Sequence, residues 1–249
     1  MIPAWIDAIA FTSVWAAAVA GALCAAASLS MGVSPPIAAI GIAASGTLFV
    51  YNIDRLRDLE QDFATTPLRS AFIVRHARAV AALTVVSAVA AAGFAAVLGW
   101  RALLLLLPAL VLGLLHRRLK RVPYAKPAYI TTAWLVVVVG LPASLAPSVA
   151  HAIPVAAVLG LSIAANVIAS NLRDRESHSP RAALHIARGL ATAGVIAALL
   201  SPDPVTPLVG VPALTFAALL RRRLTERYGL LVVDGALLVG AAIAIAWVP

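Results

Sequence analysis

Long runs of apolar residues constrain this sequence more than any other feature. Most of them are close to the ~20 residues that an α-helix needs to cross about 30 Å of hydrocarbon. Together with a hydrophobic content of 62% and a mean hydropathy of +0.98, they predict an all-α, polytopic membrane protein. We expect one domain over residues 1–249, with nine transmembrane helices at roughly 4–24, 33–53, 79–98, 102–115, 128–146, 152–171, 182–200, 205–220 and 229–248.

The basic residues are distributed unevenly between the predicted loops. The loops at 54–78, 116–126, 172–188 and 221–227 hold 18 of the 19 Lys and Arg residues, and Arg101 is the remaining one. The positive-inside rule therefore predicts a protein of the cell membrane with these loops and the N-terminus in the cytoplasm and the C-terminus outside. The net charge of +9 then reflects contact with membrane lipids, and nucleic acid is not expected as a partner.

A first polar island follows the second apolar stretch. Asp54, Asp58 and Asp62 recur at i, i+4 and i+8, so a continuing helix would place them on one face together with Tyr51. Like charges at this spacing repel each other, and a bound divalent cation would remove the repulsion. Carboxylate oxygens suit Mg²⁺. The alternative is a solvated helix end with Asp–Arg pairs.

Basic residues accompany this island. Arg69 follows it closely, and the loop at 116–126 contains Lys120 and Arg121. A diphosphate that bridges Mg²⁺ and cationic side chains would require this combination. The loop at 116–126 is equally compatible with contacts to lipid headgroups.

A second polar island ends the sixth apolar stretch. Asn171, Asp174 and His178 fall at i, i+3 and i+7 and share a helix face. Four predicted spans separate the two islands, so both lie on the same side of the membrane. We therefore expect the helices to be bundled around a cytoplasm-facing cavity that both islands line.

Two further residues in apolar stretches have open or simple interpretations. Asp234 lies about a turn and a half into the last stretch, where an intramembrane carboxylate marks either a functional group or a buried structural pair. Cys24 is the single cysteine and falls in an Ala-rich stretch. We expect it to be a packed core residue.

The first island resembles a motif of the UbiA-type intramembrane prenyltransferases. That motif has the form N-D-x-x-D-x-x-x-D, followed by a proline five residues on and an arginine seven residues on. Asp58, Asp62, Pro67 and Arg69 match this spacing, whereas Asp54 replaces the asparagine and Arg55 the first aspartate.

Two other segments are also similar to the family. The segment LKRVPYAK, with Lys120 and Arg121, looks like the loop after its fourth helix. The family's second motif has the form D-x-x-D-x-x-x-D and lies at the end of helix six. In this sequence it corresponds to Asn171, Asp174 and His178, so two of the three acids are altered.

The resemblance implies a Mg²⁺-dependent enzyme that ionises an isoprenyl diphosphate, after which an aromatic or lipophilic acceptor attacks the allylic cation. Asp58, Asp62 and Asp174 would hold Mg²⁺ and are the catalytic candidates. The substrate-binding candidates are Tyr51, Asp54, Arg69, Lys120, Arg121, Asn171 and His178.

Three other functions remain open. A terpene cyclase with this fold would quench the cation internally without an acceptor. The altered second motif also fits a non-catalytic relative that binds isoprenoid or quinone lipids. A transporter would use intramembrane acids, but a midplane site is then expected, whereas these acids cluster at one end.

Overall fold

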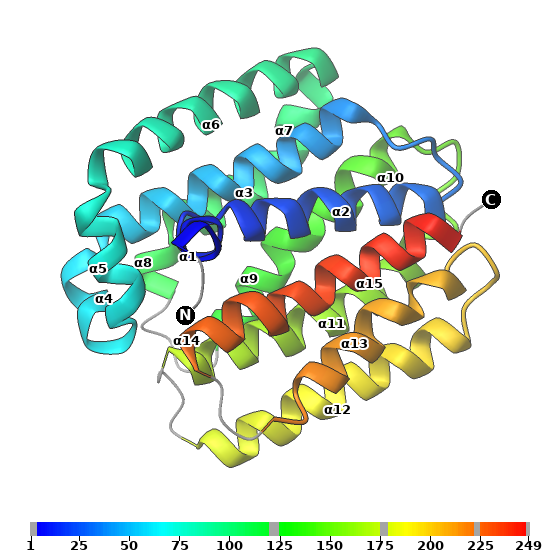
Figure 1. The fold of residues 1–249 in the computed structure, drawn as a ribbon. Helices are drawn as coiled ribbons and strands as arrows, with labels where there is room; N and C mark the ends of the chain where they lie inside the picture. The colour runs from blue at the N-terminus through cyan, green and yellow to red at the C-terminus, as the bar shows by residue number, and fades with distance from the viewer. Residues whose placement is uncertain (1–3, 120–124, 175–178, 222–224, 248–249) are drawn as a thin grey trace.

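The computed structural model describes residues 4–119, 125–174, 179–221 and 225–247, and this part of the chain contains helices but no strand. The helices pack side by side into a bundle (Figure 1). In chain order they are α1 (Ala4–Phe11), α2 (Val14–Ser30), α3 (Ile37–Arg57), α4 (Leu59–Thr65), α5 (Pro67–Arg75), α6 (Ala77–Leu98), α7 (Trp100–Leu114), α8 (His116–Leu119), α9 (Ala125–Leu135), η1 (Val136–Gly140), α10 (Leu141–Leu145), α11 (Ala152–Arg173), α12 (Pro180–Leu199), η2 (Thr206–Val209), α13 (Gly210–Ala218), α14 (Glu226–Tyr228), η3 (Gly229–Val233) and α15 (Asp234–Trp247).

Six helical segments are long and apolar enough to cross a membrane. The pair α1 and α2 qualifies only when its two helices are taken together, and this pair is bent by 64°. The described chain therefore has six candidate spans, or seven with the bent pair, which supports a multi-pass membrane protein. The six are Ile37–Arg57, Ala77–Leu98, Ala125–Leu145, Ala152–Arg173, Pro180–Leu199 and Glu226–Trp247.

The predicted count of nine spans is not confirmed, because two of the apolar stretches form shorter helices. Helix α7 has 15 residues, about 22 Å at 1.5 Å per residue, and contains Pro108. The stretch at 205–220 begins with the 3₁₀ turn η2 and continues as the nine-residue α13. Both fall short of the ~30 Å hydrocarbon thickness.

The first apolar stretch contains a break that hydropathy does not reveal. Ser13 has a φ of 65°, a left-handed conformation that is uncommon outside glycine, and α1 ends just before it. Arg55 Nη1 donates to the Phe11 carbonyl at 2.6 Å, and Ser13 Oγ donates to Asn52 Oδ1 at 2.9 Å. Contacts from α3 thus satisfy polar groups at the break.

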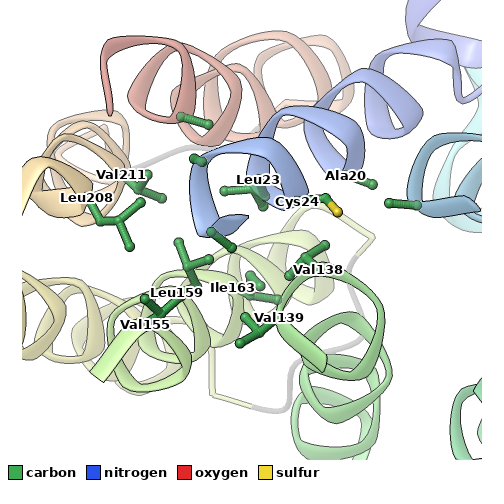
Figure 2. Packing of buried hydrophobic residues seen from close by; sticks show 14 of the residues in the cluster. Ala20, Leu23, Cys24, Val138, Val139, Val155, Leu159, Ile163, Leu208 and Val211 are labelled. Atoms are coloured by element: carbon green, nitrogen blue, oxygen red, sulfur yellow. The ribbon is translucent and has the colours of Figure 1, made fainter. Parts of the chain in front are cut away.

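The hydrophobic core is built around α2. Leu23 and Cys24 are fully buried and face Val138, Leu159 and other aliphatic side chains from η1, α11 and α13 (Figure 2). Helix α2 also packs against α3 and α15. Small residues such as alanine let helices approach closely in lipid. The prediction that Cys24 is a packed core residue is confirmed.

Candidate functional site

The first island does not continue α3 as a straight helix. Helix α3 ends at Arg57, and Asp58 links it to α4 with φ −104° and ψ 15°. The backbone hydrogen bonds from Asp58 to Asp54 and from Asp62 to Asp58 persist across this joint, at 2.9 and 3.0 Å. Asp58 is buried, whereas Asp54 and Asp62 are half-buried. The predicted row of three equivalent aspartates is therefore interrupted at its middle member.

Arg69 is held in place by its own island. Its Nη2 donates to Asp62 Oδ2 at 3.2 Å and to Thr66 Oγ1 at 2.9 Å, and the side chain is buried. Asp62 and Arg69, which the family motif places seven residues apart, are therefore in direct contact. This contact explains why the chain turns between α4 and α5 at Thr66.

A distant part of the chain fixes the start of α5. The Glu226 carboxylate accepts hydrogen bonds from the backbone N–H groups of Arg69 and Leu68, at 2.7 and 3.3 Å. An acid at this position also interacts favourably with the helix dipole. The adjacent Arg227 binds both carboxylate oxygens of Asp7 at 3.0 and 2.8 Å. Helices α1, α5 and α14 are therefore tied together at one end of the bundle (Figure 1).

The end of α11 carries a second set of ion pairs. Arg173 binds both oxygens of Asp174 at 2.8 and 3.1 Å, and its Nη1 lies 3.9 Å from Asp234 Oδ2. Asn166 donates to the other Asp234 oxygen at 2.9 Å. Asp234 is therefore part of a hydrogen-bonded pair. Gly229 permits this packing, because a Cβ there would lie 2.5 Å from Arg173 Cδ.

Electrostatics connects the two islands. Burial by itself would raise the pKa of Asp174, but Arg173, with further contributions from Arg69 and Lys126, lowers that pKa to about 2. Arg69 belongs to the first island, Asp174 to the second, and Lys126 to the start of α9. The prediction that both islands lie at the same end of the bundle is consistent with these interactions.

Arg55 joins the two sets of charges. Its side chain is buried, and its guanidinium is within electrostatic range of Arg69, Arg173 and Tyr51. The Tyr51 hydroxyl accepts a hydrogen bond from Trp134 Nε1 at 3.2 Å. We call these eight side chains the polar cluster: Tyr51, Arg55, Asp62, Arg69, Asn166, Arg173, Asp174 and Asp234.

Two π-helical turns adjoin the polar cluster. The turn η1 begins two residues after Trp134, which donates its hydrogen bond to Tyr51 of the cluster, and η3 ends immediately before Asp234. Such turns interrupt otherwise regular helices and occur frequently at functional sites. They shift the register of α9 and α15 where these helices supply polar side chains.

Several buried polar atoms have no hydrogen-bond partner within the described chain, among them Asn52 Nδ2 and Ser70 Oγ. Two others belong to residues predicted to bind substrate: Arg69 Nε, a donor, and Asn171 Oδ1, an acceptor. A buried polar group without a partner costs about 1–3 kcal/mol, and a bound ligand with both acceptor and cationic character would satisfy the pair. The two atoms come from the two different islands.

The predicted metal ligands do not form a ready-made metal centre. Among the described residues, no group of three or more His, Cys, Asp or Glu side chains is close enough to hold an ion. Asp62 and Asp174 each pair with an arginine. Mg²⁺ commonly uses one or two carboxylates together with substrate phosphates, and the free oxygen of Asn171 suits that donor set. The magnesium site therefore stays a prediction.

Several predicted features are not described by this structure. Lys120, Arg121 and His178 lie outside the described residues, so their positions relative to the polar cluster stay predictions. The predicted cavity also stays a prediction, since the two surface hollows described below have other linings. The orientation of the termini in the membrane is likewise a prediction.

Sequence reasoning missed several members of the polar cluster. Arg55 and Arg173 were assigned no role, although their burial and pairing are central to the cluster. Their burial depends on contacts between distant segments, which a single sequence does not show. Asn166 was visible as one amide within an apolar run, and this was the only local signal for the pairing with Asp234.

Comparisons with protein-family models, with curated proteins and with solved structures give no match to this chain. The similarity to the UbiA-type family therefore rests on the motif residues alone.

Proposed function

We propose that this protein transfers an isoprenyl group from an isoprenyl diphosphate to a lipophilic acceptor in the membrane. The observation that carries the proposal is a pair of buried polar atoms without a hydrogen-bond partner in the described chain, Arg69 Nε and Asn171 Oδ1. One belongs to each of the two segments that the motif comparison associates with a single diphosphate site. Their location at one end of a largely apolar bundle suits a substrate with a charged head and a hydrocarbon tail.

The proposed roles follow from the atoms that each side chain offers. Arg69 Nε has no partner in the described chain and is an N–H donor, so it would bind a diphosphate oxygen. Arg55 adds a second buried guanidinium nearby. Both cations would stabilise negative charge on the departing diphosphate. Lys120, Arg121 and His178 are further proposed contacts.

The oxygen donors define where a cation would be held. Asp58 and Asp62 would be its carboxylate ligands, with Asn171 Oδ1 and Asp174 as additional oxygens, and Asp54 would assist. When bound, Mg²⁺ would neutralise diphosphate charge and so favour its departure. Tyr51 would face the developing carbocation through its ring.

The test uses the full-length protein in lipid nanodiscs, supplied with Mg²⁺, isoprenyl diphosphates of several lengths and a panel of quinone and phenolic acceptors. We expect release of diphosphate and formation of a prenylated acceptor. Asp58→Asn and Asp62→Asn should each lower the rate by at least about 100-fold, the usual scale when a charge-stabilising group is lost.

Asp203→Asn is the matched control. It makes the same chemical change at an exposed position between α12 and η2, at the opposite end of the bundle (Figure 1). Its rate should equal that of the unsubstituted protein. Diphosphate release without acceptor consumption would indicate a terpene cyclase. The absence of any turnover across the panel would contradict enzymatic transfer.

A second candidate is a non-catalytic protein that binds isoprenoid or quinone lipids. The pairing of Asp62 with Arg69 and of Asp174 with Arg173 favours it, because these carboxylates already have cationic partners. Calorimetric titration distinguishes the two. A binding protein would take up the isoprenoid alcohol as tightly as its diphosphate, with or without Mg²⁺, and would release no diphosphate.

A further inference from the structure

The junction of α5 and α6, six residues beyond Arg69 of the polar cluster, forms a basic hollow. We call residues 74–79 the elbow. They line a hollow of about 480 Å³, and Arg75 also lines a neighbouring hollow of about 180 Å³ together with Leu68 and Phe72. Arg75 thus stands between two depressions, one of which is lined mainly by apolar side chains. The elbow lies at the same end of the bundle as α4 and α14 (Figure 1).

The positive charge of the elbow is not neutralised by the described protein. Arg75 and Arg78 are exposed, and the ion pairs among the described residues involve neither of them. The one acid that lines either hollow is Asp7, whose two oxygens are bound by Arg227. An external anion would therefore meet two available guanidinium groups.

An apolar stripe continues from this charge along the outside of α6. Arg78, Ala82, Val85 and Val89 are spaced at i, i+4, i+7 and i+11 and share one helix face. All four are exposed, Val85 by 64% and Val89 by 68%. They belong to a candidate span in which only 22% of the most apolar 18-residue stretch is buried. The stripe is about 16 Å long, which is roughly the depth of one bilayer leaflet.

We infer that the elbow binds the phosphate headgroup of an anionic phospholipid whose acyl chain lies along this stripe. Guanidinium groups bind phosphate oxygens by charge-assisted hydrogen bonds, and Arg75 and Arg78 are placed at the end of the stripe where a headgroup would lie. Lipid is preferred over a soluble phosphate because the apolar stripe adjoins the charges. The site is independent of the proposed prenyl transfer.

The experiment cross-links photoactivatable phosphatidylglycerol to the full-length protein in nanodiscs and maps the adducts by peptide mass spectrometry. We expect adducts within residues 74–89. Arg75→Gln with Arg78→Gln should reduce them about 30-fold, since each arginine at an anionic membrane surface contributes about a fivefold factor. Arg75→Lys with Arg78→Lys keeps the charge and should retain most of the adducts.

The matched control is Arg181→Gln with Arg221→Gln, which removes the same charge from exposed positions in the first turn of α12 and just beyond the end of α13. It should leave the adducts at 74–89 unchanged. An equal loss in the control would show that only general surface charge matters, and would overturn the site. Equal labelling by phosphatidylcholine, or displacement by inorganic phosphate, would also overturn it.

Discussion

Helices α6 and α11 have almost the same hydropathy but occupy different environments. Each has 22 residues, and the most apolar 18-residue stretches of the two helices have mean hydropathies of 2.2 and 2.1. In α6, however, 22% of this stretch is buried, and in α11 56% is buried. Helix α6 lies at the outside of the bundle, and α11 packs against α9, α12 and α13 (Figure 1). Hydropathy thus identifies a span without locating it in the bundle.

The side chains that distinguish the two helices are polar. Helix α11 contains Asn166 and ends at Arg173. Both contact Asp234 of another segment, Asn166 by a hydrogen bond at 2.9 Å and Arg173 by an ion pair at 3.9 Å. The buried hydroxyls of α6, Thr84 and Ser87, bond to the backbone of their own helix. Interhelical polar contacts therefore mark the inner helix.

Arg173→Met should produce the largest loss of stability. It leaves the carboxylates of Asp174 and Asp234 near one another without their shared cation, and breaking a buried ion pair costs about 3–5 kcal/mol. Unfolding in mixed micelles, followed by tryptophan fluorescence, measures this change. Arg78→Gln on α6 should cost no more than about 0.5 kcal/mol. Similar losses for both variants would contradict the assigned inner and outer positions.

Truncation of apolar side chains should show the same contrast on a smaller scale. Leu159 on α11 is fully buried, so Leu159→Ala should lower the free energy of unfolding by about 2–3 kcal/mol through lost packing. Val85 on α6 is 64% exposed, and Val85→Ala should change the free energy by less than about 0.5 kcal/mol. The same micelle titration compares them.

Acid should weaken the end of α11. The pKa of Asp174 is about 2 in the folded protein, below its ordinary value, so its ionised form favours folding at pH above about 4. This contribution, about 2 kcal/mol, is lost as the pH falls from about 4 to 2. Stability curves at pH 6, 3 and 2 should therefore converge for the unsubstituted protein and Asp174→Asn. An unchanged gap at pH 2 would place the pairing elsewhere.

The smallest expected effect compares two single hydrogen bonds. Asn166→Ala removes the contact to Asp234 and should cost about 1 kcal/mol, the upper part of the range for interhelical polar contacts. Thr84→Ala removes a hydroxyl that bonds to Val80 O within α6 and should cost less than about 0.5 kcal/mol. If Thr84→Ala were the more damaging, α6 would have an unrecognised polar partner.

The sequence was informative where local composition decides the structure. The candidate spans at Ala77–Leu98, Ala152–Arg173 and Pro180–Leu199 begin and end within about three residues of the predicted apolar stretches. Helix formation within a membrane is local, because every backbone group must be satisfied within its own segment. The placement of Arg69 and Asp174 on one side of the membrane stays a prediction, because the four spans counted between them included the short helix α7.

The sequence failed where a distant contact decides. The break at Ser13 depends on Arg55, which binds the Phe11 carbonyl from 44 residues away. The start of α5 depends on Glu226, more than 150 residues away. Neither pair has a spacing that a helix period would reveal. Arg69, which lies 3.2 Å from Asp62, also offsets part of the like-charge repulsion on which the Mg²⁺ prediction depends.

The contact between α2 and α15 has a consequence for biosynthesis. Helix α2 is the centre of the core, and α15, which is made more than 200 residues later, covers one of its sides. Glu226 and Arg227, which precede α15, also complete the ties to α5 and α1. The ribosome must therefore deliver the chain as far as α15 before the centre is enclosed, and until then α2 depends on temporary neighbours in the insertion machinery or the bilayer.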